Sequence, residues 1–270
     1  MRKTVQKSRH SHPIIIAVDV GNTSITVGAL RKNKILRIFQ TVGVSIPYFD
    51  DILRLCGRYN SNYKVVISSV NPIRLKKLMS QWSQRVDKEN FLLIGRNIKP
   101  KIQHKYNKLN KLGQDRLVNI YGALKRFRLP VVIFDFGTAI TVDFINEQGV
   151  FEGGLIVPGL EISKEALEKR TALLPSVGNV EMIAPTVRSI NLVGRNTQSC
   201  MKLGLLQGFG AMVDGLIERY RSKFGQDLNV LACGGFAKIL RPFIRHRITV
   251  DRYHTLKSIS MICDDYLNKG

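Results

Sequence analysis

The stretch that decides the fold follows a short apolar run and reads Asp135-Phe136-Gly137-Thr138-Ala139-Ile140-Thr141-Val142-Asp143. The run before it, residues 131–134, holds only valine, isoleucine and phenylalanine, which is typical of a buried strand. A Gly-Thr turn follows, and polar residues then alternate with apolar ones, which predicts a returning strand. The tip of such a hairpin can offer a carboxylate to a cation, and a hydroxyl and backbone N–H groups to phosphate oxygens.

A second copy of this pattern lies near the N-terminus. Apolar residues 14–18 lead into Asp19-Val20-Gly21-Asn22-Thr23-Ser24-Ile25-Thr26-Val27. Both copies run from an apolar strand through Asp-x-Gly and small polar residues to Ile-Thr-Val. One such hairpin can arise by chance, but two copies, each opening a domain-sized stretch, indicate two phosphate-facing hairpins in a duplicated fold.

The length and composition suit a soluble protein of two α/β lobes, since 270 residues are enough for a sizeable core and 44% are hydrophobic. The longest apolar runs are strand-sized, so we expect no membrane span. The basic N-terminus lacks the apolar region of a signal peptide. The four cysteines form no C-x-x-C pair, which argues against a zinc site or a disulfide framework and predicts a cytoplasmic location.

The charge is strongly positive, because 42 Lys and Arg residues face 20 Asp and Glu residues, a net charge of +22. Such an excess suits nucleic acid, an anionic membrane surface or anionic substrates. The basic residues are spread along the chain and form no single block. This distribution weakens the nucleic-acid interpretation without removing it.

The first half of the chain alternates strands with helices, which predicts an α/β fold with a mostly parallel or mixed sheet. Residues 1–12 are expected to be a disordered basic arm, followed by an N-terminal lobe over 13–128 and a C-terminal lobe over 129–270. In the first lobe we predict a helix over 47–58, another after the Asn71-Pro72 cap, and strands over 13–20, 24–30, 34–41, 64–70 and 91–94.

The second half contains fewer regular patterns. A glycine-rich segment at 153–159 enters a helix over 160–170, and an irregular connection follows over 171–193. A long helix starts at 194–197, and its apolar residues at helical spacing are predicted to be core: Met201, Leu205, Phe209, Met212, Leu216 and Tyr220. Glycines 204, 208 and 210 within it predict close packing. A strand over 228–232 ends in Gly234-Gly235 before a helix over 235–244, a third and weaker nucleotide-binding candidate.

Asp115 is the single acidic residue in the basic segment 95–128, where a helix is predicted to begin near Gly113. Two interpretations stand side by side. Asp115 is either a first-turn carboxylate stabilised by the helix dipole and by Arg116, or a carboxylate kept ionised by the surrounding cations so that it acts as a base.

Taken together, these motifs resemble the type III pantothenate kinases of bacterial coenzyme A synthesis. The resemblance covers nearly the whole chain after the first dozen residues, and rests on residues 19–23, 113–116, 135–139, 153–154, 158–159, 171–175 and 196–197. It implies two duplicated lobes of the actin-like ATPase (ribonuclease H-like) and sugar-kinase superfamily. It further implies a homodimeric transferase that uses ATP, Mg²⁺ and a monovalent cation, K⁺ or NH₄⁺, to phosphorylate the primary hydroxyl of pantothenate.

The resemblance also implies roles for single residues. Asp135 would bind the monovalent cation, Asp19 would bind Mg²⁺ directly or through water, and Asp115 would be the catalytic base. ATP would contact Asp19, Val20, Gly21, Asn22, Thr23, Ser24, Ile25, Thr26 and Thr138. The substrate would contact Tyr106, Gly113, Gln114, Asp115, Arg116 and Thr197. Gln114, where the family usually has a small residue, and Lys108, where a proline is common, depart from the pattern at the mouth of the pocket.

The chemistry fits these residues independently of the resemblance. Phosphoryl transfer needs positioning and charge neutralisation, and the sequence contains no G-x-x-x-x-G-K-[ST] motif, so an ordinary P-loop is excluded. Two alternatives remain: a regulatory or nucleic-acid-binding protein on a kinase scaffold, and a related kinase for another small hydroxyl compound. The basic excess supports the first, whereas Asp19, Asp115 and Asp135 oppose it. We expect nucleic-acid binding to be weak and non-specific if it occurs, and no membrane partner.

Overall fold

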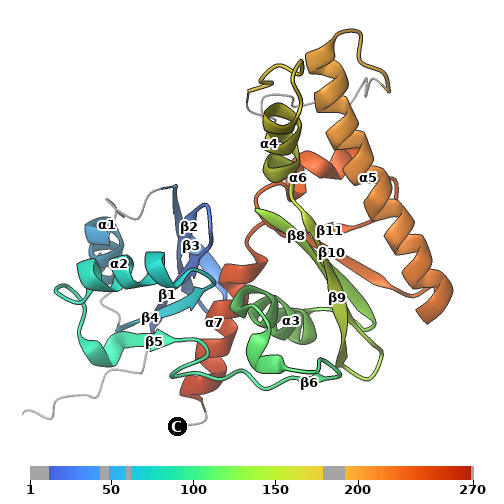
Figure 1. Cartoon of the computed structure of the whole chain (residues 1–270). Coiled ribbons are helices and arrows are strands. Elements are labelled where there is room, and N and C mark those ends of the chain that lie inside the picture. Colours follow the sequence, from blue (N-terminus) through green and yellow to red (C-terminus); the bar gives the residue numbers. More distant parts are fainter. Residues whose placement is uncertain (1–11, 43–48, 59–61, 179–191, 269–270) are drawn as a thin grey trace, which may run out of the picture. The chain divides into compact units, whose positions relative to one another are not determined.

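The computed structural model describes residues 12–42, 49–58, 62–178 and 192–268 (Figure 1). The chain forms two compact units. Unit 1 comprises Met1–Pro100, Gly113–Val118 and Leu256–Gly270, and unit 2 comprises Lys101–Leu112 and Asn119–Thr255. These units are discontinuous, whereas the predicted lobes, 13–128 and 129–270, are contiguous.

Unit 1 is built on a five-stranded mixed sheet in the order β3-β2-β1-β4-β5. The strands are β1 (Ile14–Val20), β2 (Ile25–Arg31), β3 (Lys34–Thr41), β4 (Tyr63–Ser69) and β5 (Phe91–Leu93). Residues 14–18 of β1 are all fully buried, as expected for a central strand covered on both faces. The helices are α1 (Phe49–Arg58), α2 (Pro72–Trp82) and the 3₁₀ turn η1 (Lys88–Asn90).

Unit 2 is built on a six-stranded sheet in the order β11-β10-β7-β8-β9-β6. Its strands are β6 (Gln103–His104), β7 (Val131–Phe136), β8 (Ala139–Ile145), β9 (Val150–Pro158), β10 (Asn229–Cys233) and β11 (Thr249–Val250). Its helical elements are α4 (Leu160–Arg170), α5 (Thr197–Phe224), α6 (Ala237–Leu240) and the 3₁₀ turns η2 (Leu109–Lys111) and η4 (Arg241–Phe243). Two further helices, α3 (Gln114–Arg126) and α7 (His254–Leu267), each contribute residues to both units.

The two sheets repeat one topology. In each, three strands form an antiparallel meander, and two later strands add in parallel beside the first: β1 to β5 in unit 1 and β7 to β11 in unit 2. Even the irregularity matches, because the pairing register shifts once in each second hairpin, at Ala29/Leu30 and at Phe144/Ile145. The predicted fold class, two duplicated lobes with mixed sheets flanked by helices, is confirmed.

Most predicted elements of the first half lie within two residues of the observed ones, as does the helix at 160–170. Strand β9 was not predicted, since its two glycines suggested a loop. The helix predicted over 235–244 is wrong: α6 covers four residues and a 3₁₀ turn follows it. Residues 171–178 and 192–193 are irregular as predicted, whereas residues 1–11 of the arm, Pro47, and 179–191 lie outside the described residues.

The long helix α5 is more apolar than the sequence analysis allowed. It has 28 residues, and its 18-residue window of highest mean hydropathy reaches 1.2, so its length and composition would be enough to cross a membrane. In unit 2 it serves as a core helix, because it buries Leu206, Val213 and Ile217 in the main cluster together with the carboxylate of Asp214.

The buried stripe of α5 is shifted by about one position from the predicted one. Met201 is buried as predicted, whereas Leu205, Phe209, Met212, Leu216 and Tyr220 are only half-buried at the margin of the core. Of the glycines that predicted close packing, Gly210 confirms it, because a side chain there would collide with the backbone of Phe243. No atom of the described residues lies within 4 Å of a side chain placed at Gly204 or Gly208.

Candidate functional site

The predicted ATP loop of unit 1 forms a tight turn between β1 and β2. The Gly21 N–H donates to the Ser24 carbonyl over 3.0 Å, and Asp19 pairs with Thr26 across the antiparallel ladder. Asn22 and Thr23 at the tip are exposed. The turn therefore presents the small polar residues Asn22 and Thr23 to solvent, as expected for a phosphate-binding hairpin.

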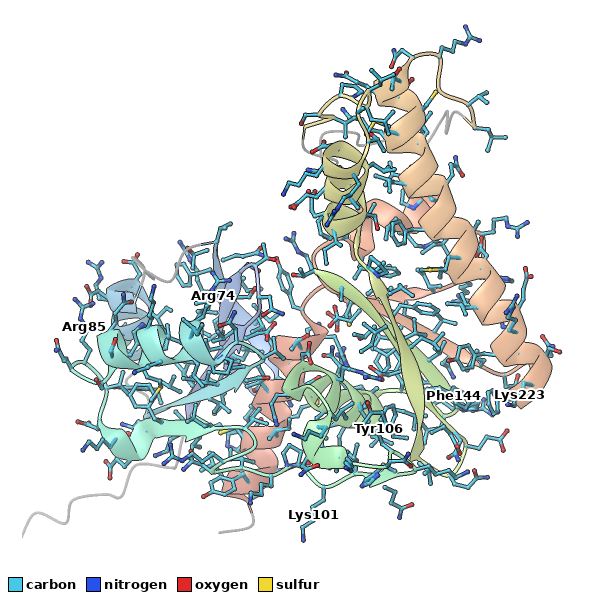
Figure 2. The ribbon with its side chains drawn as sticks, viewed as in Figure 1. Arg74, Arg85, Lys101, Tyr106, Phe144 and Lys223 are labelled. Atoms are coloured by element: carbon cyan, nitrogen blue, oxygen red, sulfur yellow. The ribbon has the colours of Figure 1, made fainter. Side chains whose placement is uncertain are left out.

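Two residues that the sequence analysis did not assign to the site hold this loop from α2. The guanidinium of Arg74, which is labelled in Figure 2, donates to the carbonyls of Gly21, at 3.3 Å, and Asn22, at 2.7 Å. It also donates to the Val42 carbonyl. Asn71, the N-cap of α2, donates to the Asn22 side chain over 3.3 Å. Because these bonds span 32 to 53 residues of sequence, no local pattern indicated them.

The predicted acceptor segment begins α3. A side chain at Gly113 would place its Cβ 2.5 Å from the Asp115 Oδ1 atom, so the glycine makes room for the carboxylate. The Arg116 backbone N–H donates to the same oxygen over 2.8 Å, and the Arg116 side chain is buried. Asp115 thus lies half-buried in the first turn of the helix.

Burial has the largest influence on the Asp115 carboxyl and raises its pKa above the ordinary 3.8. The backbone N–H and the charge of Arg116 act in the opposite direction. Among the cations of this basic segment, Arg116 is the one that lowers the pKa of Asp115, and desolvation by burial outweighs it. That Asp115 stays ionised as a base remains a prediction. A raised pKa is what general-base catalysis favours, since a base works best when its pKa lies closer to the working pH.

Gln114, the departure from the family pattern, packs over Gly95. Gly95 has a φ of 88°, and a Cβ there would lie 2.8 Å from the Gln114 amide nitrogen. Together with Ser69 and Arg96, both residues line a cavity of about 290 Å³ in unit 1. The Gln114 Oε1 atom is buried without a hydrogen-bond partner among the described residues. Lys108, the other departure, is exposed in unit 2.

The second hairpin, in unit 2, is tightly enclosed by glycine backbone. Asp135 and Thr138 are half-buried at its tip. The Gly159 N–H donates to the Thr138 carbonyl over 3.1 Å, and a side chain at Gly159 would collide with that carbonyl. Gly234, with a φ of 87°, is similarly confined, since a Cβ there would collide with Asp135 Oδ1. The Gly234-Gly235 turn, read from sequence as a separate weak candidate, therefore belongs to the Asp135 site.

Tyr106 and Thr197, both predicted to contact substrate, belong to different ends of unit 2. Tyr106, which is labelled in Figure 2, follows β6. Its ring stacks on Phe151, with ring centroids 5.8 Å apart. Thr197 is exposed and begins α5, just after the N-cap Asn196. In Figure 1, β6 and the beginning of α5 lie at opposite ends of the unit. Within one chain, the structure does not bring these two residues together.

The oxygen donors near Asp19 and Asp135 fit hard cations. Among the described residues there is no group of three or more His, Cys, Asp or Glu side chains that could hold a metal. A single carboxylate suits Mg²⁺ that is bound mainly by phosphates and water. At the second hairpin, Asp135 supplies a carboxylate and the following Gly137-Thr138 turn contains a hydroxyl and carbonyl oxygens, which are oxygen donors of the kind that hard cations prefer.

Comparison with known proteins identifies relatives over most of the chain. The family model for type III pantothenate kinase matches residues 15–219. The type III pantothenate kinase of Citrifermentans bemidjiense is 30% identical over 257 residues, which cover 92% of this chain and 98% of that protein. That of Listeria monocytogenes is 31% identical over 259 residues, which cover 92% and 96%.

Solved structures show the same fold at lower identity. A Baf-family protein from Campylobacter jejuni superposes with a TM-score of 0.56 at 18% identity, covering 94% of this chain and 99% of that one. The activator of the 2-hydroxyisocaproyl-CoA dehydratase from Clostridium difficile gives 0.51 at 13%, covering 95% and 97%. The sequence relatives confirm the resemblance drawn from the motifs: this chain belongs to the type III pantothenate kinase family.

Proposed function

We propose that this chain transfers the γ-phosphoryl group of ATP to the primary hydroxyl of pantothenate. The products are 4′-phosphopantothenate and ADP, in the first step of coenzyme A synthesis. The observation that carries the proposal is the family match over residues 15–219, which includes both phosphate hairpins and the Asp115 segment. The Asp-x-Gly turns at Asp19 and Asp135 and the carboxylate at Asp115 supply the chemistry that such a transfer needs.

The nucleotide is assigned to the two hairpins. Residues Asp19 to Thr26 and Thr138 would hold the phosphates through backbone N–H groups and hydroxyls. Arg74 supports this assignment, because it occupies loop carbonyls and so turns the N–H side of the peptides outward. A preset loop loses little entropy when the phosphates bind.

Asp115 is assigned as the base. As the bond from the pantothenate oxygen to the γ-phosphorus forms and the bond to the β-phosphate oxygen breaks, the hydroxyl proton passes to the Asp115 carboxylate. Arg116, Gly113 and Gln114 would orient the acceptor, together with Tyr106 and Thr197. The half-buried position and raised pKa of Asp115 support this role.

The cations are also assigned from the donor sets. Asp135 would bind K⁺ or NH₄⁺, and Asp19 would bind Mg²⁺ directly or through water. When bound, these cations neutralise the charge that phosphates accumulate during transfer. The strongly basic chain would further attract both anionic substrates.

A homodimer is proposed with this function. Along α5, no atom of the described residues lies within 4 Å of a side chain placed at Gly204 or Gly208, so a second helix could approach closely. Ile156 and Ile162 are exposed on the same unit. A second copy could also supply Thr197 to a site that holds the Tyr106 of the first. Sedimentation velocity at micromolar concentration tests this assembly. The four cysteines are free thiols, which supports a cytoplasmic location.

The activity is tested by measuring ADP release with a panel of hydroxyl compounds. We expect ATP consumption that depends on pantothenate and Mg²⁺ and rises with K⁺ or NH₄⁺, but not with pantothenate analogues whose primary hydroxyl is replaced by hydrogen. Folded protein that releases no ADP with pantothenate under any cation condition would overturn the proposal. Turnover of a different hydroxyl compound alone would favour the related-kinase alternative.

A further inference from the structure

A network of hydrogen bonds between buried polar groups leads from Asp135 to helix α7 in unit 2. The Asn119 side chain, 1% exposed on α3, donates from Nδ2 to Asp135 Oδ2 over 2.9 Å. Its Oδ1 atom accepts from the Thr255 hydroxyl over 2.9 Å, and its backbone carbonyl contacts His254 Nε2, also at 2.9 Å. Asn119 thus joins the hairpin carboxylate to the first two residues of α7.

The orientation of each group in this hydrogen-bond network follows from which of its atoms donate and which accept. A carboxylate can only accept, so the amide nitrogen of Asn119 must face Asp135 and its oxygen must face the Thr255 hydroxyl. His254 Nε2 donates to the Asn119 carbonyl, and His254 Nδ1 accepts from Arg126, 2.9 Å away, because a guanidinium cannot accept. Arg126 in turn pairs with Asp251 over 2.8 Å.

The Asp135 carboxylate is consequently fixed on two sides. Asn119 holds Oδ2, and the backbone at Gly234 borders Oδ1 so closely that no side chain fits there. Rotation of the carboxylate would break the bond to a buried amide, which would then lack a partner in surroundings that water hardly reaches. The carboxylate is therefore held in one orientation before any ligand binds.

We infer that Asn119 is a positioning residue that presets the Asp135 carboxylate for the monovalent cation, with Thr255 and His254 fixing Asn119 in turn. This inference rests on the proposed role of Asp135 as the cation ligand. Partners that hydrogen-bond to metal-ligating groups are typically worth about 10–100-fold in metal affinity or activity. Asn119 lies 16 positions from Asp135 and 136 positions from Thr255 along the chain, so no local sequence motif predicts this arrangement.

Thr255→Val tests the inference most sharply, because valine keeps the shape of threonine and removes only the hydroxyl. We expect the K⁺ concentration that gives half-maximal activation to rise about tenfold, with ATP turnover largely restored at saturating K⁺. Thr255→Ser retains the hydroxyl and should activate like the parent. Ser260→Ala, on the same helix, removes a buried hydroxyl that has no hydrogen-bond partner among the described residues and should also match the parent.

A second readout does not depend on turnover. The melting temperature of the protein with a non-hydrolysable ATP analogue is followed while K⁺ is titrated, with choline replacing K⁺ at constant ionic strength. We expect the K⁺-dependent rise in the parent to require about tenfold more K⁺ in Thr255→Val. If both variants of Thr255 respond at the parent's K⁺ concentrations, Asn119 does not position the ligand and the inference is wrong.

The failure of the underlying assignment looks different. If the parent itself shows no K⁺ dependence in either measurement, Asp135 is not a cation ligand and this inference is wrong as well. The proposed phosphorylation of pantothenate is not affected by that result. A K⁺ response in the parent that Asp135→Asn abolishes, combined with an unchanged Thr255→Val, would overturn only the positioning role of Asn119.

Discussion

Asp115 is a carboxylate whose surroundings work against its charge. Burial raises its pKa, and the opposing effects come mainly from the backbone N–H and charge of the neighbouring Arg116. A group that only capped the helix would gain from exposure, where the dipole acts without a desolvation cost. Its position in the first turn of α3, with Gly113 making room for the carboxylate, therefore favours the catalytic interpretation over the purely structural one.

Replacement of Asp115 by asparagine separates the two interpretations. We expect Asp115→Asn to lower kcat by about 10²–10⁴-fold, because the proton acceptor is lost while the shape is kept. ATP binding, measured by calorimetry, should stay near that of the parent, since the variant leaves both hairpins intact. The matched control is Asp51→Asn in the first turn of α1, which is expected to keep full activity. Turnover of Asp115→Asn within a few-fold of the parent would contradict the assignment.

The pH dependence follows from the direction of the pKa shift. Because the pKa of Asp115 is raised in the folded state, the folded protein binds this proton more tightly than the unfolded chain does, and stability falls as the pH rises from 3.8 to the raised value. At neutral pH, the ionised Asp115 therefore lowers the free energy of unfolding of the parent, and Asp115→Asn removes this destabilisation. We expect the variant to melt at the same temperature as the parent or higher, whereas loss of a mere dipole interaction would cost about 0.3–1 kcal/mol.

The difference between local and long-range interactions explains which site residues the sequence could predict. Asp19, Asp115 and Asp135 stand in short local patterns of glycine and small polar residues after apolar runs, and such patterns survive without knowledge of the fold. Arg74 and Asn119 instead form hydrogen bonds to groups far away in the sequence. Arg74 donates to the Asn22 carbonyl, 52 residues away, and Asn119 accepts from the Thr255 hydroxyl, 136 residues away. Nothing near either residue distinguishes it from an ordinary helical arginine or asparagine.

At the scale of elements, α5 shows how a buried charge fixes the packing of a helix. The Asp214 carboxylate, 2% exposed, accepts the backbone N–H groups of Arg245 at 3.0 Å and His246 at 3.1 Å. One turn earlier, Gly210 allows the helix to touch the backbone of Phe243. The backbone of the segment around η4 is therefore held against α5 by hydrogen bonds to Asp214 and by close contact at Gly210, in addition to the packing of Phe243 and Ile244 in the core.

We predict that Asp214→Ala destabilises the protein by about 2–3 kcal/mol in urea unfolding. The substitution leaves two backbone N–H groups without their acceptor, and hydrogen bonds to charged groups are worth about 1.5–3 kcal/mol. The salt bridge to Arg245 contributes little, because that side chain is 80% exposed. Glu218→Ala, one turn further along the exposed face, is the control and should cost less than about 1 kcal/mol. Equal losses for the two variants would contradict this account.

Element prediction failed where the tertiary context overrides composition. Strand β9 contains Gly153 and Gly154, which favour loops in isolation. Every residue of β8 nevertheless pairs with a residue of β9. The same context shifts the buried stripe of α5, because the sheet meets the helix at Leu206, Val213 and Ile217 and leaves the neighbouring apolar residues at the margin. Periodicity identified the helix but could not tell which of two adjacent apolar stripes faces the core.

At the scale of the whole molecule, the duplicated topology was predictable and the assignment of the last helix was not. The two Asp-x-Gly hairpins in the sequence predicted the duplicated fold. Residues 256–270, however, belong to unit 1, where Leu256 packs against Gly28 of β2 and Ile259 and Ile262 are buried. An apolar helix that follows the second sheet carries no local sign of which sheet it covers.

We predict that removal of residues 256–270 destabilises unit 1 rather than unit 2. The truncation exposes the core surface around Gly28 and removes three large buried side chains, each worth about 1.5–3 kcal/mol. Hydrogen exchange followed by mass spectrometry should show lost protection in β1 and β2, with β7 and β10 retaining theirs. A matched truncation of residues 264–270 spares those side chains and should leave protection near that of the parent. Loss confined to unit 2 would contradict the division into units.

The discontinuity of unit 1 also bears on the order in which the protein can mature on the ribosome. Synthesis delivers β1 to β5 first, but their final covering residues, from Leu256 onward, emerge only after all of unit 2 has been made. At about 5–20 residues per second, the first sheet waits on the order of ten seconds or more with part of its apolar surface uncovered. Unit 2, whose residues 119–255 are consecutive, does not share this delay. The N-terminal half of the chain is therefore the part that most needs protection by chaperones during translation.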